Sequence, residues 1–213
     1  TDWCRGAGSG RGMVGWEGAV AKGQGGGGRG RGRAVGAVVA ACRHGAIEFA
    51  GVGEAAVGAG NLAIPLVKQV TAQVKAQDPE AARYVHWGAT SQDAIDTGLV
   101  LQLRGALDAA ETLLEQLLAA LALQADRYRD TVMPGRTWMQ HALPVTFGLK
   151  LAGTLDALLR WQQRLREMRP RLLALQFGGA AGTLDALKEK GPAVGLALAQ
   201  ILGLSLPDTP WHS

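Results

Sequence analysis

The chain has 213 residues, of which 47% are apolar, so it can bury a sizeable core and cannot be disordered throughout. Its net charge of +4 lies mostly at one end, because residues 1–60 hold seven Lys/Arg against four Asp/Glu and the remainder adds only +1. Charged or amide side chains interrupt every apolar run within about ten residues, whereas a membrane-spanning helix needs about 20, which excludes a membrane protein.

The cysteine content and the N-terminus indicate the compartment. Cys4 and Cys42 are the only cysteines and resemble no disulfide framework. No charged start followed by an apolar run, the pattern of a secretion signal, stands at the N-terminus. We therefore expect a cytoplasmic protein that is neither secreted nor membrane-bound.

Residues 1–60 hold 19 of the 31 glycines and read as irregular or poorly assigned sequence. Glycine loses much conformational freedom in a helix, which favours a flexible arm. Arg29, Arg31 and Arg33 alternate with glycine and would suit phosphate contacts, but no aromatic side chains are interleaved for base stacking. A nucleic-acid-binding arm is therefore the minor alternative, and we expect no nucleic-acid partner.

A helical remnant survives among these glycines. Met13, Trp16 and Glu17 keep the spacing of one helix face, as if glycine stood where other side chains belong. We predict that residues 13–40 are mostly helical. Together with a short amphipathic helix from about Leu62 to Val74, they predict an N-terminal helical domain over residues 1–96.

Two long helices are predicted in the rest of the chain, a helical-bundle domain over residues 97–213. Leucine and alanine recur every three or four positions over residues 97–129 and again over residues 142–169. Met133-Pro134-Gly135 separates the two runs, so the helices should be antiparallel, with no β-sheet of consequence. Their apolar faces are wider than a two-helix contact requires, and we expect other subunits to cover them.

Two polar clusters flank the first long helix. "HWGATSQD" combines His86, Thr90, Ser91 and Gln92, far more polar chemistry than a helix cap needs. The second, "GRTWMQHALPVTFGLK", is predicted to form the turn and the head of the second long helix, and its functional candidates are listed together: Arg136, Thr137, Trp138, Gln140 and His141. Taken alone, this second cluster also fits a helix cap with a core-facing histidine.

A third cluster, "LQFGGAAGTLDAL", contains Gly178, Gly179 and Gly182. It lacks the pattern of a nucleotide-binding loop, so close backbone packing, or anion binding by free N–H groups, is the better interpretation. His86 and His141 lie too far apart, and the carboxylates are too scattered, for metal-ligand spacing. We expect no metal site.

These motifs carry a resemblance. "TWMQHALP" resembles the T-x-x-Q-x-A-x-P pattern of the fumarase/aspartase superfamily, and "YVHWGATSQDAIDTGLVLQLR" resembles its first signature block. Trp138 separates the branches, because the adenylosuccinate and argininosuccinate lyases carry His directly after this Thr. The chain therefore resembles the cycloisomerase branch, strongly from about Gly60 to Ser213 and faintly from Met13 to Phe49.

The resemblance implies an all-α fold in which long central helices of four subunits form the core and each active site is drawn from three chains. It implies reversible lactonization of 3-carboxy-cis,cis-muconate, a tricarboxylate, to a carboxymuconolactone in protocatechuate degradation, with no cofactor. Among catalytic candidates it implies His141, ranked first, His86 and Ser91. Thr90, Gln92, Arg136, Thr137, Trp138 and Gln140 would bind substrate.

Some alternatives stay open. The superfamily's third signature, a loop resembling G-S-S-x-M-P-x-K-x-N, is not found before Ser213, so we expect this chain to be part of a longer one and inactive without that loop. An adenylosuccinate-lyase-like C–N lyase, a cycloisomerase for another substituted muconate, and a non-catalytic helical module with an Arg-Gly arm are the competing interpretations.

Overall fold

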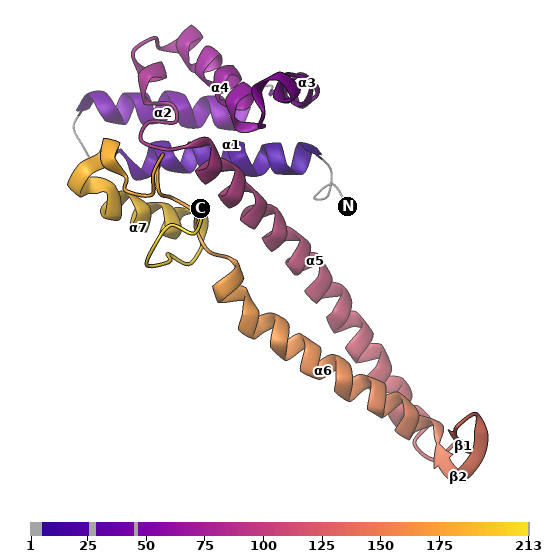
Figure 1. Ribbon diagram of the computed structural model, residues 1–213. Coiled ribbons are helices and arrows are strands. Elements are labelled where there is room, and N and C mark those ends of the chain that lie inside the picture. The colour runs from indigo at the N-terminus through magenta and orange to yellow at the C-terminus, as the bar shows by residue number, and fades with distance from the viewer. Residues whose placement is uncertain (1–5, 26–28, 45–46, 213) are drawn as a thin grey trace. The chain divides into compact units, whose positions relative to one another are not determined.

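The computed structural model describes residues 6–25, 29–44 and 47–212, and almost all of its regular structure is helical (Figure 1). The contacts divide the chain into two compact units. The first unit comprises Thr1–Gly105 and Pro170–Ser213, and the second comprises Ala106–Arg169. The expectation of an all-α chain is confirmed by this architecture, apart from one two-stranded hairpin.

The first unit is a cluster of short helices. Its elements are α1 (Gly6–Gly23), α2 (Arg29–His44), α3 (Phe49–Ala59), α4 (Ala63–Gln77), η2 (Ala81–Tyr84), the start of α5 (Ser91–Arg127), η3 (Asp185–Lys190) and α7 (Gly191–Leu202). The predicted helical character of residues 13–40 is confirmed by α1 and α2, and the short amphipathic helix is α4. Cys4, and the side chains of Arg29 and Arg31, lie outside the described part of the chain.

The core of this unit forms around α1. Met13, Trp16 and Val20 recur at three and four residues, so they share one helix face, and all three are fully buried. They lie in a core with apolar side chains of other elements: Leu66, Val70 and Val74 of α4, Leu175, and Leu198 of α7. Glycines do not prevent α1 from forming because its stability comes from this packed face rather than from helix propensity.

Two glycines allow a close approach between α1 and α5. A Cβ atom at Gly12 would lie 2.5 Å from the carbonyl oxygen of Gly98, and one at Gly98 would lie 3.1 Å from the backbone nitrogen of Met13. The contact at Gly12 is shorter than real Cβ contacts, so glycine is required there, and a Cβ at Gly98 would force the facing part of α1 to shift. By contrast, a Cβ at Gly15, Gly32 or Gly36 would meet nothing within 4 Å.

The second unit contains the rest of α5, most of α6 (Phe147–Leu172) and an antiparallel hairpin, β1 (Val132–Thr137) and β2 (Gln140–Thr146), which connects them (Figure 1). Ionic contacts join the two helices. Arg166 lies 2.9 Å from Glu111 and 3.1 Å from Glu115, and Arg169 pairs with Asp108. The two predicted antiparallel helices are therefore present, and α5 begins six residues earlier than expected.

The start of the second long helix was predicted wrongly. Residues 142–146 lie in β2, where Pro144 pairs with Pro134, and the helix begins at Phe147. The side chain of Thr146 accepts a hydrogen bond from the Leu149 N–H (3.1 Å), which caps the helix at this point. The Phe147 N–H also donates to the carbonyl of Thr131 (2.8 Å), so the hairpin closes directly onto the helix.

Candidate active site

The loop His86–Thr90 leads into α5, and a single carboxylate organises it. Asp93 is completely buried. One of its oxygens accepts a hydrogen bond from the Thr90 N–H (3.0 Å), which turns the loop back over the start of α5. Gly88 adopts a positive φ of 74°, and a Cβ there would lie 2.8 Å from Leu187, so this turn also requires glycine.

Asp93 also binds the glycine segment "LQFGGAAGTLDAL" through hydrogen bonds. Its two oxygens accept hydrogen bonds from the backbone N–H groups of Gly178 (2.9 Å) and Gly179 (3.0 Å) and from the side-chain amide of Gln176 (3.0 Å). The interpretation that the free N–H groups of this glycine segment bind an anion is therefore confirmed, and the anion is the chain's own carboxylate. A buried charge with four donors is well stabilised.

Gln176 extends this network to the last described residues. Its backbone N–H and carbonyl both contact the hydroxyl of Thr97, at 3.0 and 2.9 Å. Its side-chain oxygen accepts from the N–H groups of Trp211 (2.7 Å) and His212 (3.0 Å). One buried amide and one buried carboxylate thus connect the first signature block, the glycine segment and the terminal "PWHS".

His86 is paired rather than free. Its Nδ1 lies 2.5 Å from Oε1 of Glu17, whose side chain is completely buried on α1. Burial, the largest single influence, lowers the pKa of His86, but the hydrogen bond and charge of Glu17 and the charge of Asp93 together raise this pKa above its ordinary value. His86 also adopts a positive φ of 59°, and its ring centroid lies 5.7 Å from that of Trp16.

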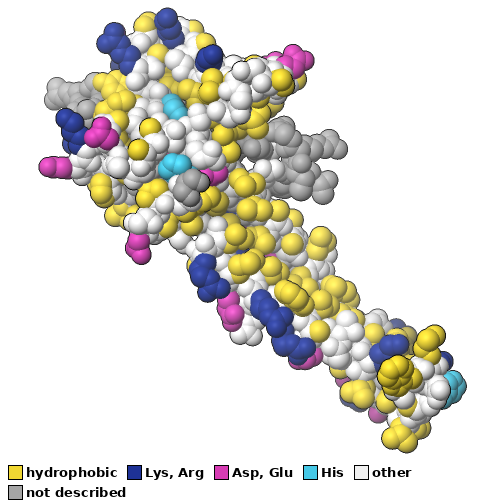
Figure 2. All heavy atoms as spheres, viewed as in Figure 1, with side chains coloured by type: hydrophobic (Ala, Val, Ile, Leu, Met, Phe, Trp, Pro, Cys, Tyr) yellow, Lys and Arg dark blue, Asp and Glu magenta, His cyan; other side chains and the backbone are white. Residues whose placement is uncertain are grey.

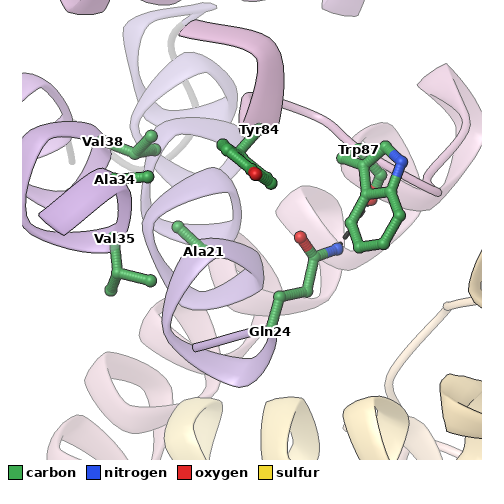
Figure 3. Close-up of a pocket in the computed structure, with 7 residues that line it drawn as sticks. All are labelled: Ala21, Gln24, Ala34, Val35, Val38, Tyr84 and Trp87. Carbon is green, nitrogen blue, oxygen red and sulfur yellow. Dashed lines mark hydrogen bonds between the residues drawn. The ribbon is translucent and has the colours of Figure 1, made fainter. Parts of the chain in front are cut away.

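The neighbouring Trp87 lines a small apolar niche between η2, α1 and α2 (Figure 3). Ala21, Ala34, Val35 and Val38 form its helical walls, and Tyr84 meets Trp87 edge-on. The side-chain amide of Gln24 donates to the carbonyl of Trp87 at 2.6 Å, as the dashed line in Figure 3 indicates. The backbone directly after His86 is thereby fixed to the residue that follows α1.

The other loop candidates lie at the start of α5. Thr90 and Ser91 are partly exposed, and Ser91 is the first residue of the helix. Gln92 is exposed, and its amide donates to Asp96 at 2.6 Å. Thr90 and Ser91 therefore present hydroxyl groups near a helix N-terminus, where free N–H groups favour an anion.

The second set of candidates lies on the hairpin, not at a helix head. Arg136 pairs across the strands with His141, and Thr137 pairs with Gln140. Trp138 forms the turn together with Met139, both at positive φ, and each side chain is 94% exposed. The helix-cap interpretation of this cluster is wrong, because strand pairing rather than a helical turn brings Thr137, Gln140 and His141 together.

The structure thus gathers the predicted site residues into two groups. His86, Thr90, Ser91 and Gln92 belong to the first unit, and the hairpin residues belong to the second. Figure 2 shows apolar side chains together with basic ones at the hairpin end of the second unit. A tip with Trp138 and Met139 so fully exposed is unusual for a surface without a partner.

Sequence reasoning missed three residues that organise the site: Glu17, Gln176 and the anchoring role of Asp93. Glu17 carried a usable signal, because it follows Trp16 on an otherwise apolar face of α1. Among the described residues, no group of three or more His, Cys, Asp or Glu side chains is arranged to hold a metal ion, and no helix is long and apolar enough to cross a membrane. Cys42 is a free thiol, and burial, with the charge of Glu17, raises its pKa to about 12.

Comparison with known proteins agrees with this geometry. A family model described as "Lyase" matches residues 39–212. The 3-carboxy-cis,cis-muconate cycloisomerase of Pseudomonas aeruginosa is 55% identical over 203 residues, which cover 95% of this chain and 44% of that protein. The protein of the same name from Bradyrhizobium diazoefficiens is 50% identical, over 94% of this chain and 45% of its own length.

The solved structures give the same result. The crystal structure of the 3-carboxy-cis,cis-muconate lactonizing enzyme from Pseudomonas putida matches with a TM-score of 0.90 at 52% identity and covers 95% of this chain and 46% of that one. The chain therefore belongs to the lyase family of the fumarase/aspartase superfamily. It spans a little under half the length of the relatives it matches.

Proposed function

We propose that this chain belongs to a cycloisomerase that interconverts 3-carboxy-cis,cis-muconate and a carboxymuconolactone, a step of protocatechuate degradation. The observation that supports this most is the 55% identity over 203 residues to a protein of that name. The proposal includes a cytoplasmic location, because two cysteines in 213 residues form no disulfide framework.

The reaction requires side chains that donate hydrogen bonds to a developing negative charge and a group that transfers a proton. A carboxylate oxygen of the substrate adds to an alkene carbon, and the alkene electron pair moves onto the conjugated carboxylate to give an enolate-like species. A proton then adds to the neighbouring carbon. Hydrogen-bond donors aimed at the developing charge lower the barrier, because they stabilise the transition state more than the ground state.

Both groups of candidates supply such donors. Thr90, Ser91 and Gln92 would do so at the start of α5, and Thr137 and Gln140 on the hairpin. Arg136 would offset part of the substrate's negative charge, and Trp138 would close over its carbon skeleton. His141, exposed on β2 beside Arg136, is proposed as the group that exchanges the proton, because an imidazole can both accept and donate a proton.

We further propose that the two groups form one site between subunits of a homotetramer. In the single chain, large side chains along α5 and α6 are exposed to water: Leu113, Leu117, Leu123, Leu149, Leu159 and Trp161. Faces with so many exposed apolar side chains are favourable when further helices cover them, and we propose that helices of other subunits do so. The exposed tip at Trp138 would then lie against a neighbouring loop at Thr90.

The alternatives make different predictions. A C–N lyase acting on adenylosuccinate conflicts with Trp138, which stands where those lyases carry His. A cycloisomerase for another substituted muconate shares the fold and most donors, so only the substrate separates it from the proposal. A nucleic-acid-binding arm would show affinity for RNA or DNA that falls steeply with salt.

The proposal is tested by the complete product of the gene, purified and assayed with 3-carboxy-cis,cis-muconate and with adenylosuccinate by ultraviolet absorbance. We expect loss of the muconate absorbance and formation of lactone, and no change with adenylosuccinate. Turnover of adenylosuccinate, or of a differently substituted muconate in preference to the 3-carboxy compound, would contradict the proposal.

A further inference from the structure

Glu17 is a buried carboxylate for which the reaction outlined above has no use. It lies on the core face of α1, and its side chain is completely inaccessible to solvent. Oε1 contacts His86 at 2.5 Å, whereas Oε2 has no hydrogen-bond partner among the described residues. A buried carboxylate with one unsatisfied oxygen is unfavourable unless its partner carries the opposite charge.

The surroundings of His86 favour that charge. The charged groups that act on it are Glu17 from α1 and Asp93 from α5, both negative. The thiol of Cys42 on α2, whose pKa is raised by burial and by the charge of Glu17, stays protonated at neutral pH and adds no charge. Both charged groups therefore favour the imidazolium form, and the ring of Trp16 covers one side of His86 without competing for its nitrogens.

The backbone fixes His86 just as firmly. It stands at a positive φ of 59°, which a residue with a side chain rarely adopts unless the surrounding structure enforces it. In the residues that follow it, the Gln24 side chain donates to the carbonyl of Trp87, and Asp93 accepts from the N–H of Thr90. The contact of Nδ1 with Glu17 sets the orientation of the imidazole, and among the described residues no hydrogen bond engages Nε2.

We propose that Glu17 is a positioning residue that holds His86 as an imidazolium whose Nε2–H binds a carboxylate of the substrate. This rests on the proposed function for the identity of the ligand, but not for the pairing itself. His86 thereby serves to bind charge rather than to exchange the proton, and the role of His141 is separate. About a sixth of the His86 side chain is exposed (17%), enough for one hydrogen bond to a ligand.

The pairing is tested on the complete gene product by nuclear magnetic resonance of the histidine ring nitrogens, with the His86 signals assigned from a His86→Gln variant. We expect His86 to titrate above its ordinary pKa of 6.5 and Nδ1 to remain protonated in the neutral ring. Glu17→Gln should lower this pKa. Glu54→Gln, an exposed position on α3, is the matched control and should leave it unchanged.

A His86 pKa at or below 6.5 in the unchanged chain overturns the proposal even if Glu17→Gln does not fold. So does an equal His86 pKa in the chain and in a folded Glu17→Gln variant. Glu17→Asp, which keeps the charge on a shorter side chain, should retain more of the shift than Glu17→Gln.

The ligand is tested by kinetics of the complete gene product with 3-carboxy-cis,cis-muconate. Glu17→Gln should raise KM more than it lowers kcat. It should also move the alkaline limb of the pH profile of kcat/KM to lower pH, and at a pH above that limb each unit by which the pKa falls should lower kcat/KM about tenfold. Equal losses in kcat and kcat/KM, with no shift of the limb, would contradict carboxylate binding. If the protein without substitutions turns over no muconate, the proposed function is refuted instead. The magnetic resonance titration then still tests whether Glu17 and His86 form a charged pair.

Discussion

Asp93 explains why so much polar chemistry precedes a long helix. The polar residues of "HWGATSQD" are evident from the sequence, but the role of its carboxylate is not. The buried Asp93 side chain accepts hydrogen bonds from the loop, from Gln176 and from the glycine segment. The polar side chains of this motif therefore have three roles. Asp93 anchors the loop, His86 pairs with the buried Glu17, and the hydroxyls of Thr90 and Ser91 remain for a ligand.

Asp93→Asn should strongly destabilise the first unit. The asparagine side chain removes the charge and turns an NH₂ group toward N–H donors, so at least one buried donor loses its acceptor, at a cost of about 3 kcal/mol in the free energy of unfolding. Urea denaturation followed by circular dichroism measures this. Asp96→Asn, which removes the charge from the acceptor of exposed Gln92 and keeps an amide oxygen there, is the control, and equal losses in both variants would contradict the role of Asp93.

The pair of His86 and Glu17 also predicts how stability depends on pH. The pKa of His86 is raised in the folded chain, so the folded state binds a proton more tightly than the unfolded state does. The resulting stabilisation is complete below the unfolded value near 6.5 and is lost as pH rises through the raised value. Unfolding at several pH values should show this loss in the unchanged chain and not in His86→Gln; parallel curves would refute it.

Among single residues, the sequence allowed the exposed polar candidates to be predicted better than the buried polar residues that position them. His86, Thr90 and His141 were identified because polar residues cluster visibly along the chain. Glu17 was seen only as part of a helical remnant, since a glutamate on a helix is ordinarily solvated and its partner lies 69 positions away. Long-range pairing of this kind has no periodic signal in the sequence.

Among the elements, the long helices were predictable and the hairpin was not. Leucine recurs at three and four positions along α5 and α6, which is a direct signal. The strands of the hairpin have a much weaker signal, because most of their side chains are exposed and only the first part of β1 alternates between exposed and half-buried residues. The turn residues Trp138 and Met139 also lack the Asn-Gly or Asp-Gly sequence that usually marks a tight turn.

The glycines of α1 and α2 should respond to substitution in opposite ways. Gly36→Ala, in exposed helix with no atom within 4 Å of the new Cβ, should raise the free energy of unfolding by about 0.5–1 kcal/mol. Gly12→Ala should lower it, because the new Cβ meets the carbonyl of Gly98. Thermal unfolding of both variants tests this, and a Gly12→Ala variant as stable as Gly36→Ala would contradict the close contact between α1 and α5.

The hairpin carries the proposed proton-exchanging group. His141→Asn should lower kcat by about 10²-fold in the complete gene product if the imidazole transfers the proton, and should leave assembly intact because the side chain is exposed. Steady-state kinetics with sedimentation on the same sample measure both. Near-normal kcat would return the role to His86 or to a residue outside this chain.

At the scale of the whole molecule, the chain shows apolar surface that it cannot bury alone. Leu118 is buried on the second half of α5, whereas Leu113, Leu117 and Leu123 are exposed. Exposed leucines on these faces agree with the predicted width, and what covers them could not be read from the sequence because this chain does not contain the covering surface. The proposed tetramer would bury these faces and bring each exposed hairpin to a neighbouring loop.

The most direct test of this account mixes two inactive variants of the complete gene product. One carries Ser91→Ala with Thr90→Val in the loop, the other carries His141→Asn on the hairpin, and the two are unfolded and refolded together. If each site takes its loop and its hairpin from different chains, about a quarter of the sites in random tetramers are intact, and about a quarter of the wild-type muconate turnover should return. Each variant refolded alone should stay inactive. No recovery in mixed tetramers of confirmed composition would place both groups in one chain and contradict the shared site.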